Sequence, residues 1–274
     1  IGLACAIIHE REPDAIIGSF AADHVINPVD EFQRVVTEAV ITAASGKIVT
    51  IGITPTEPSS AFGYIRACTP LGLAHAPNAL AVESFVEKPD SETAQKYLDS
   101  GDYTWNAGMF VAPVSLMLQH LEKNEPELYA GVMKIAKAWD TPERESIMEQ
   151  TWGTLPKTAI DYAVAEPAAA AGDVAMVPGS FSWDDVGDFD AVARLNQEKH
   201  GEGLTILGDE DNVINQGCSG IVVANSNRKI SVIGLEDIVV VDTPDALLVA
   251  PRERAQAVKD TVAELKDRGL ADLL

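Results

Sequence analysis

The amino-acid sequence predicts an α/β domain built on a mainly parallel, mixed sheet, followed by a small β-rich module and a C-terminal helix. Through residue 203, segments with helical spacing of apolar residues alternate with short apolar strands. After that come short β runs separated by Gly, Asn and Asp, and the chain ends with one more helical pattern. We therefore expect a first domain at residues 1–203 and a second domain at residues 204–274.

The first elements follow from apolar spacing and from turn residues. Residues 3–9 are apolar and uncharged, and Pro13 marks a break before a strand at residues 15–20. The next helix begins near Pro28, which suits a first helical turn, and Gly46 ends it. A strand is expected directly after that glycine. Apolar residues recur along the helix at the spacing of one face, at Phe32, Val35, Val36, Ala39 and Val40.

The middle of the chain continues the alternation of strands and helices. Gly101 suits the end of a helix because glycine readily adopts the left-handed conformation found there. Pro167 indicates the end of another helical segment. The expected elements are a strand at 81–87, a helix at 90–101, a strand running into helices at 109–139, a helical segment at 158–167 and an extended strand at 175–183.

The second domain has a different sequence pattern. Residues 204–251 contain short β runs without a helical pattern, which favours a solenoid-like module, although no strict repeat period is present. The last helix carries one apolar face, expected to pack on the β module of the same chain or, less favoured, on a neighbouring subunit. That face comprises Ala255, Val258, Val262 and Leu265.

Composition excludes several classes of partner. With 42 acidic and 20 basic residues the formal net charge is −22, which repels nucleic acid and anionic lipid but leaves room for a small anionic substrate. Three widely spaced cysteines offer neither a disulfide framework nor a metal-binding pair, which favours a reducing cytoplasm. No apolar run is long enough to cross a bilayer, and no signal peptide is evident.

Several polar residues follow directly on expected strands. Asp23 ends such a strand, where ligands bind in open α/β sheets, although an isolated Asp is more often a helix cap or turn residue. Glu87 and Lys88 end another, where a solvated ion pair is the plainer interpretation. Asp184 and Asp185 stand between an aromatic residue and a Val-Gly step, as either a surface turn or a metal or phosphate site.

Asn106 lies among aromatic residues in YTWNAGMF, where its amide can both donate to and accept from hydroxyl groups. A turn asparagine is about as plausible there. The motif FGYI around Gly63 is also compatible with a simple turn.

The order of these motifs is more specific than any one of them. ADHVI, FGYI, VEKP, WNAGMF, IDYAVAE and WDDVGDF occur in succession, and the chain resembles the mannose-1-phosphate guanylyltransferases, which are sugar nucleotidyltransferases with a Rossmann-like catalytic domain. The resemblance extends into the β segment and the closing helix. EKP and NAG also occur in nucleotidyltransferases for other bases, so an enzyme for another sugar 1-phosphate or base is an alternative.

The resemblance implies transfer of GMP from GTP to mannose 1-phosphate, giving GDP-mannose and pyrophosphate. Asp23 and Asp185 would hold Mg²⁺, whereas Asp184 would be a solvated neighbour or lie just outside the ligand set. Lys88 would bind the sugar phosphate, and we count it with Asp23 and Asp185 as catalytic. The remaining substrate-binding residues implied are Gly63, Glu87, Asn106, Asp161 and Glu166.

The sequence departs from the family pattern in three places. Ala159 stands where the family usually has Ser, and Pro167 where Lys is common. The Gly-rich loop that cradles the triphosphate is absent, so we expect a missing N-terminal segment and no turnover without it. A non-catalytic relative that binds a sugar nucleotide is therefore a second alternative. A homodimer with contacts through the C-terminal module is expected.

Overall fold

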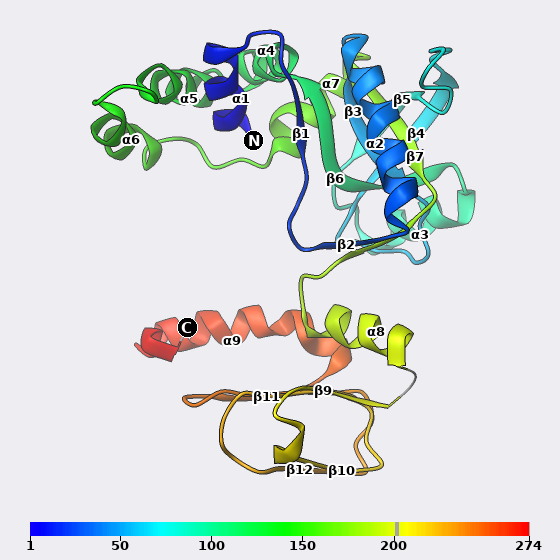
Figure 1. Cartoon of the computed structure of the whole chain (residues 1–274), viewed down its shortest axis with the longest axis vertical. Helices are drawn as coiled ribbons and strands as arrows, with labels where there is room; N and C mark the ends of the chain where they lie inside the picture. Colours follow the sequence, from blue (N-terminus) through cyan, green and yellow to red (C-terminus); the bar gives the residue numbers. More distant parts are fainter. Residues whose placement is uncertain (201–202, 274) are drawn as a thin grey trace. The chain divides into compact units, whose positions relative to one another are not determined.

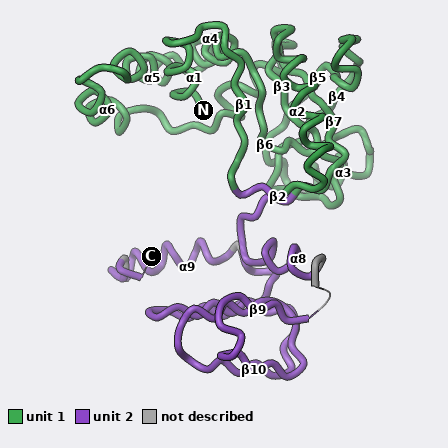
Figure 2. Tube along the Cα trace, viewed as in Figure 1, with its two compact units in different colours: residues 1–22, 26–183 green, residues 23–25, 184–274 purple. Residues whose placement is uncertain are grey.

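The computed structural model describes residues 1–200 and 203–273, which form two compact units (Figure 2). Unit 1 comprises residues 1–22 and 26–183, and unit 2 comprises residues 23–25 and 184–274. Strands β2 (His24–Asn27) and β8 (Ser182–Asp185) pair as a two-stranded sheet. Unit 2 thus includes a short piece of the chain that precedes most of unit 1.

Unit 1 contains a six-stranded mixed sheet. In spatial order it consists of β1 (Ile16–Ser19), β6 (Tyr103–Pro113), β3 (Ile48–Ile53), β7 (Val174–Gly179), β5 (Leu80–Val86) and β4 (Gly63–Pro70). The α/β class and the mixed sheet are confirmed. The expectation of mainly parallel strands was wrong, because among the described pairings of this sheet only β3 with β7 is parallel. Helices between strands predict parallel crossovers, but β6 pairs antiparallel with β1, β3 and β4.

Helices cover both faces of the sheet (Figure 1). Strand β3 alternates between them, with Ile48 packed in the core on one face and Val49 and Ile51 in the core on the other. The second core includes the apolar side of α2 (Val29–Ala44). The first is covered by α1 (Gly2–Arg11), α4 (Val114–Asn124), α5 (Pro126–Ala138) and α7 (Glu166–Ala170).

Helix ends follow the sequence where the capping residues are strong. Helix α3 (Ser91–Ser100) begins after Asp90, whose carboxylate accepts a hydrogen bond from the Thr93 backbone N–H at 2.7 Å, and ends at Gly101 with φ +70°. Pro167 does not end a helix as expected. It lies in the first turn of α7, where a missing N–H costs nothing, directly after the π-helical turn η1 (Asp161–Ala165).

Several elements of the fold were missed by the sequence patterns. The FGYI motif opens strand β4, in which Tyr64 and Ile65 are fully buried. Helix α8 (Phe189–His200) follows the paired aspartates, and α6 (Arg144–Trp152) completes the helices of the middle segment. Within the part of the chain that the structure describes, no helix is both long and apolar enough to cross a membrane.

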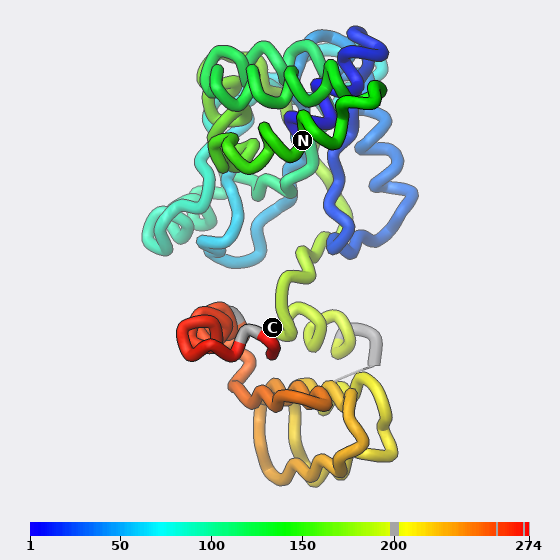
Figure 3. The backbone as a smooth tube through the Cα atoms, turned by 90° about the vertical axis from the view of Figure 1, so that its left-hand side faces the viewer, coloured from blue at the N-terminus to red at the C-terminus, as the bar shows by residue number. Residues whose placement is uncertain are grey.

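Unit 2 is a short solenoid, as expected. Strands β9, β11 and β13 pair in parallel, β10 pairs in parallel with β12, and the successive coils stack on one another (Figures 1 and 3). The interior is filled by Val222, Val232 and Val240. The strands are β9 (Leu204–Gly208), β10 (Val213–Gln216), β11 (Gly220–Ala224), β12 (Ile230–Ile233), β13 (Ile238–Asp242) and the antiparallel β14 (Leu247–Pro251).

Two helices accompany the solenoid. Helix α8 places Ala193 against Ile221 and Val239 on the outer side of the parallel strands. The C-terminal helix α9 (Val258–Asp267) has no buried residue within its bounds, so its expected apolar face is only partly covered. Between β14 and α9 runs the 3-10 segment η3 (Arg252–Ala257).

Gly220 is required by the coil geometry. Its φ is +119°, and a Cβ there would lie 2.1 Å from the Ile238 backbone oxygen, so Gly220→Ala should lower the free energy of unfolding by about 2 kcal/mol or more. Gly217 also has a positive φ of +69° but has open space around it, so Gly217→Ala should cost roughly 1 kcal/mol. Urea unfolding of both variants is the measurement, and equal losses would contradict the close contact at Gly220.

Candidate active site

The predicted sugar-binding residues come together in unit 1. Gly63 opens β4 and is paired in register with Asn106 of β6, while Glu87 and Lys88 follow the end of β5. The last two predicted residues join them through hydrogen bonds, from Asn106 to Asp161 of η1 and from the Glu87 backbone to Glu166 of α7. Residues separated by up to about a hundred positions thus form one cluster.

Asn106 is held in a single orientation by its neighbours. Its side chain is buried, and its Oδ1 accepts hydrogen bonds from Thr50 Oγ1 at 2.7 Å and from the Gly108 backbone N–H at 3.2 Å. Its Nδ2 donates to Asp161 Oδ1 at 3.2 Å. Because an amide nitrogen carries two N–H groups, Asn106 can still donate one hydrogen bond to a ligand.

Glu87 presents a carboxylate oxygen to the same place. Its side chain is 7% exposed; Oε1 accepts a hydrogen bond from Lys88 Nζ at 2.9 Å, and Oε2 is buried without a hydrogen-bond partner among the described residues. A buried acceptor without a donor is costly, so this oxygen is suited to a hydroxyl group of a ligand. Gly63 leaves room for it, because a Cβ there would lie 2.4 Å from Oε2.

Glu166 fixes the backbone of this motif. Its Oε1 accepts a hydrogen bond from the Glu87 backbone N–H at 3.1 Å. The departure at Pro167 therefore does not remove Glu166 from the cluster. In the structure, Glu166 contacts the backbone of Glu87.

The cluster concentrates negative charge around one exposed cation. Burial raises the pKa of Glu87, which the hydrogen bond from Lys88 opposes and the charge of Asp161 reinforces. Burial likewise raises the pKa of Asp161. The hydrogen bond to Glu87 raises the pKa of Lys88, so its ammonium group stays charged.

Two backbone irregularities lie at this cluster. Lys88 adopts φ +46°, a left-handed conformation that is strained for a residue with a side chain. Asp161 opens the π-helical turn, a geometry that is frequent at functional sites. Both irregularities occur at side chains that were predicted to contact the substrate.

The predicted metal carboxylates come together in unit 2. Asp23 immediately precedes β2 and Asp185 ends β8, and the Val186 backbone N–H donates to the Asp23 carbonyl oxygen at 3.1 Å. Possible ligand atoms of Asp23, His24 and Asp185 all lie within 4.8 Å of one another. Burial and the neighbouring charge of Asp23 raise the pKa of Asp185, which indicates that its negative charge is poorly compensated by the protein.

Of the two roles expected for Asp184, a solvated neighbour or a residue just outside the ligand set, the structure does not fit the first. The Asp184 side chain is only 14% exposed, and both carboxylate oxygens accept hydrogen bonds from Arg194 at 2.9 to 3.1 Å. Sequence patterns missed this pair because α8, which carries Arg194, was not predicted. They also missed Thr50, which appears in the sequence as an ordinary strand residue. His24 directly follows Asp23 in the ADHVI motif, but the motif alone did not predict its place in the cluster.

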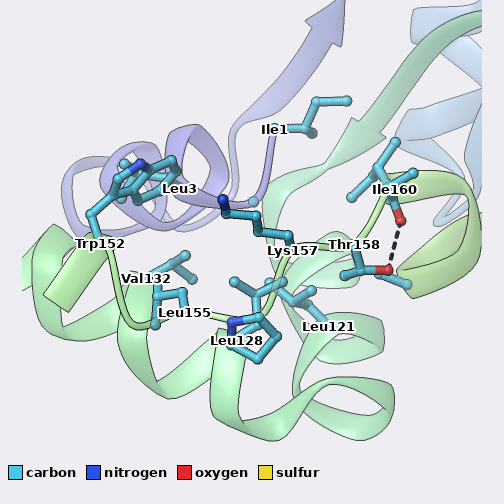
Figure 4. Close-up of a pocket in the computed structure, with 14 residues that line it drawn as sticks. Ile1, Leu3, Leu121, Leu128, Val132, Trp152, Leu155, Lys157, Thr158 and Ile160 are labelled. Carbon is cyan, nitrogen blue, oxygen red and sulfur yellow. Dashed lines mark hydrogen bonds between the residues drawn. The ribbon is translucent and has the colours of Figure 1, made fainter. Parts of the chain in front are cut away.

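A separate apolar pocket of about 630 Å³ lies among α1, α4, α5, α6 and the segment before η1 (Figure 4). None of the predicted site residues lines it. Leu155 packs against Gly131, where a Cβ would lie 2.1 Å from Leu155 Cδ2. The mainly apolar lining makes this pocket unsuitable for phosphate groups.

Residues 2–202 match the family described as nucleotidyl transferase. The chain belongs to this family. Residues 211–265 match a domain described as MannoseP isomerase/GMP-like beta-helix, in agreement with the stacked coils of unit 2. The nucleotidyl transferase match spans both the cluster around Glu87 and the pair of Asp23 and Asp185.

Curated relatives of this nucleotidyl transferase chain are longer proteins. It is 39% identical over 263 residues to the xanthan biosynthesis protein XanB of Xanthomonas campestris pv. campestris (strain B100), covering 94% of this chain and 53% of that one. It is 36% identical over 263 residues to the mannose-1-phosphate guanylyltransferase of Escherichia coli (strain K12), covering 95% and 53%. The chain thus spans about half the length of the curated relatives it matches.

A solved structure has a similar arrangement of the nucleotidyl transferase fold. It is described as mannose-1-phosphate geranyltransferase from Thermus thermophilus, with a TM-score of 0.78 and 27% sequence identity. The similarity covers 96% of this chain and 73% of that chain. It therefore includes both the α/β fold of unit 1 and the solenoid of unit 2.

The raised pKa values of Glu87 and Asp161 predict a pH dependence of stability. Their usual values are 4.5 and 3.8, so the folded state binds these protons more tightly than the unfolded chain. This contribution to stability is complete below about pH 4 and is lost as pH rises through the raised pKa values. The double variant Glu87→Gln/Asp161→Asn should therefore lose less stability than the wild type between about pH 4 and 7.

Urea unfolding at a series of pH values measures this effect. The matched control is Glu92→Gln/Asp99→Asn, which removes the same formal charges from exposed positions of α3. If the two double variants had the same pH profile, burial would not be the cause of the raised pKa values.

Proposed function

We propose that the protein transfers GMP from GTP to mannose 1-phosphate and releases pyrophosphate, giving GDP-mannose. The observation that carries the proposal is the buried, unpartnered Glu87 Oε2 beside Gly63, in a chain of the nucleotidyl transferase family. The curated relative from Escherichia coli, named mannose-1-phosphate guanylyltransferase, supports the choice of sugar and base.

The cluster of unit 1 is suited to a hexose phosphate. Glu87 Oε2 accepts a hydrogen bond from a sugar hydroxyl, and Asn106 Nδ2 donates one to another, while the Gly63 backbone N–H adds a donor. Lys88 is 58% exposed and binds the phosphate as a compact point charge. Asp161 and Glu166 contribute by orienting Asn106 and the backbone of Glu87.

The donor set of unit 2 fits a hard divalent cation. Asp23 and Asp185 supply the carboxylate oxygens that Mg²⁺ prefers, and the raised pKa of Asp185 reflects charge that a cation compensates. When bound, Mg²⁺ neutralises charge that develops on the phosphates. His24 is a less suitable Mg²⁺ ligand than either carboxylate, because its imidazole offers nitrogen rather than oxygen.

In the proposed reaction a phosphate oxygen of the sugar attacks the α-phosphorus of GTP, and pyrophosphate leaves. Such a transfer depends mainly on in-line positioning and on neutralisation of charge. Lys88 would hold the attacking phosphate, while Glu87 and Asn106 fix the sugar ring and thereby the direction of attack. A homodimer and a cytoplasmic location remain predictions within this proposal.

The function is tested by pyrophosphate release from the full-length natural protein. GTP with mannose 1-phosphate should give Mg²⁺-dependent turnover, and UTP with glucose 1-phosphate much less. Preference for the second pair would replace the proposal with the related enzyme class. Binding of GDP-mannose without turnover would indicate a sugar-nucleotide-binding relative.

Gly63→Ala should weaken binding of mannose 1-phosphate at least about tenfold, because the added methyl group displaces the acceptor Glu87 Oε2. Gly63 has no positive φ, so backbone strain does not contribute. Calorimetric titration of the purified chain measures the affinity. Gly153→Ala, at another glycine of unit 1 with open space around it, should bind like the wild type. Equal affinities of all three proteins would remove Glu87 from the sugar site.

Asp185→Asn should weaken Mn²⁺ binding at least about tenfold, because it removes one of the two charged ligands. Mn²⁺ replaces Mg²⁺ here because its electron paramagnetic resonance signal reports free and bound metal without an activity assay. Asp260→Asn, an exposed position of α9, makes the same change of charge and should leave the affinity unaltered. An equal loss in both variants would indicate that only net charge attracts the metal.

A further inference from the structure

We propose that Arg194 is a positioning residue for the metal carboxylates, acting through its ion pair with Asp184. The inference rests on the proposed function, since it concerns the cation site of Asp23 and Asp185. It assigns a role to helix α8 and to the arginine at its solvent side, neither of which was evident from the sequence motifs.

Several hydrogen bonds fix the ion pair between Arg194 and Asp184. Arg194 Nε donates to Asp184 Oδ2 at 3.1 Å, and Arg194 Nη2 donates to both carboxylate oxygens at 2.9 Å. The Asp184 side chain is 14% exposed, so the pair is partly shielded from water. Contacts of this kind are stronger and more directional than an ordinary surface ion pair.

The arginine is itself held by a second carboxylate. Arg194 Nη1 lies 3.2 Å from Asp190 Oδ2, and Asp190 Oδ1 accepts a hydrogen bond from Arg252 Nε at 2.7 Å. Arg252 is 16% exposed and donates further to Gln197 Oε1 at 3.1 Å. Its backbone N–H donates to the Asp237 carbonyl oxygen at 2.7 Å, at the turn before β13. These contacts therefore connect the pair of Arg194 and Asp184 to the solenoid.

Because of the strand geometry, the ion pair determines which of the two carboxylates faces the candidate cation site. Asp184 and Asp185 are neighbours at the end of β8, and successive side chains of a strand point to opposite faces. When Arg194 holds Asp184 on one face, Asp185 is directed to the other, where its ligand atoms lie within 4.8 Å of those of Asp23. A one-residue shift of the strand would exchange the two side chains.

Positioning and charge make opposite predictions for Arg194. A guanidinium group near a cation site repels the cation, so on charge alone its removal should strengthen metal binding. If Arg194 instead orients β8, its removal weakens metal binding although a positive charge has been lost. The sign of the change therefore separates the two roles.

The test is Mn²⁺ affinity, measured by electron paramagnetic resonance on the purified chain, for Arg194→Gln and Arg194→Lys. We expect Arg194→Gln to weaken binding by about tenfold, within the range known for residues that orient metal ligands, and Arg194→Lys to restore part of it. The double variant Asp184→Asn/Arg194→Gln should bind Mn²⁺ no more weakly than the weaker of the two single variants, because each substitution breaks the same contact. The control is Arg268→Gln, which removes an exposed arginine paired with Glu264 on α9 and should bind like the wild type.

Unchanged or tighter Mn²⁺ binding by Arg194→Gln would overturn the assignment. Circular dichroism checks that each variant is folded, and if Arg194→Gln is not, equal affinities of Arg194→Lys, Asp184→Asn and the wild type would overturn it. Failure of the proposed function has a different outcome. In that case the wild type binds no Mn²⁺, or Asp185→Asn binds Mn²⁺ as well as the wild type does. Either result would reject both the metal site and the positioning role of Arg194.

Discussion

Strand β6 is the constraint on which unit 1 depends. Over eleven residues it pairs antiparallel with β1, β3 and β4, so three parts of the sheet are aligned by one segment. Because side chains alternate along a strand, Trp105 packs on Phe62 in one core while Asn106 reaches Thr50 and Asp161 on the opposite face. The same hydrogen-bond ladder that stabilises the sheet therefore fixes the amide of the candidate site.

The cluster around that amide is stable for reasons that lie outside it. Glu87 has a buried oxygen without a partner, Lys88 has a strained backbone, and Asp161 lies in a π-helical turn. Each of these features costs free energy, and each persists because the surrounding strands and helices determine the position of the chain. A site that holds a polar ligand in this way is less stable when empty than a fully paired one, a common trade between stability and function.

Elements with strong local patterns could be predicted from sequence, and those that depend on distant partners could not. Asp90 and Gly101 define α3 by capping chemistry alone, and the motifs around Glu87 and Asn106 indicate a polar site. The direction of β6 and the burial of β4 depend on which strands meet in space, which periodicity does not specify. The role of Asp184 could not be predicted because its partner lies ten residues away on α8, a helix that the sequence patterns missed.

Helix α8 links the solenoid to the candidate metal carboxylates through packing and does not itself supply a candidate ligand. On one side of α8, Ala193 packs against Ile221 and Val239, and the next residue, Arg194, reaches Asp184. Because adjacent helical residues are about 100° apart around the axis, the packing of Ala193 sets the direction in which Arg194 points. The solenoid supplies none of the candidate metal ligands, yet its β11 and β13 form the surface on which the arginine is aligned. Its proposed contribution to the site is therefore rigidity.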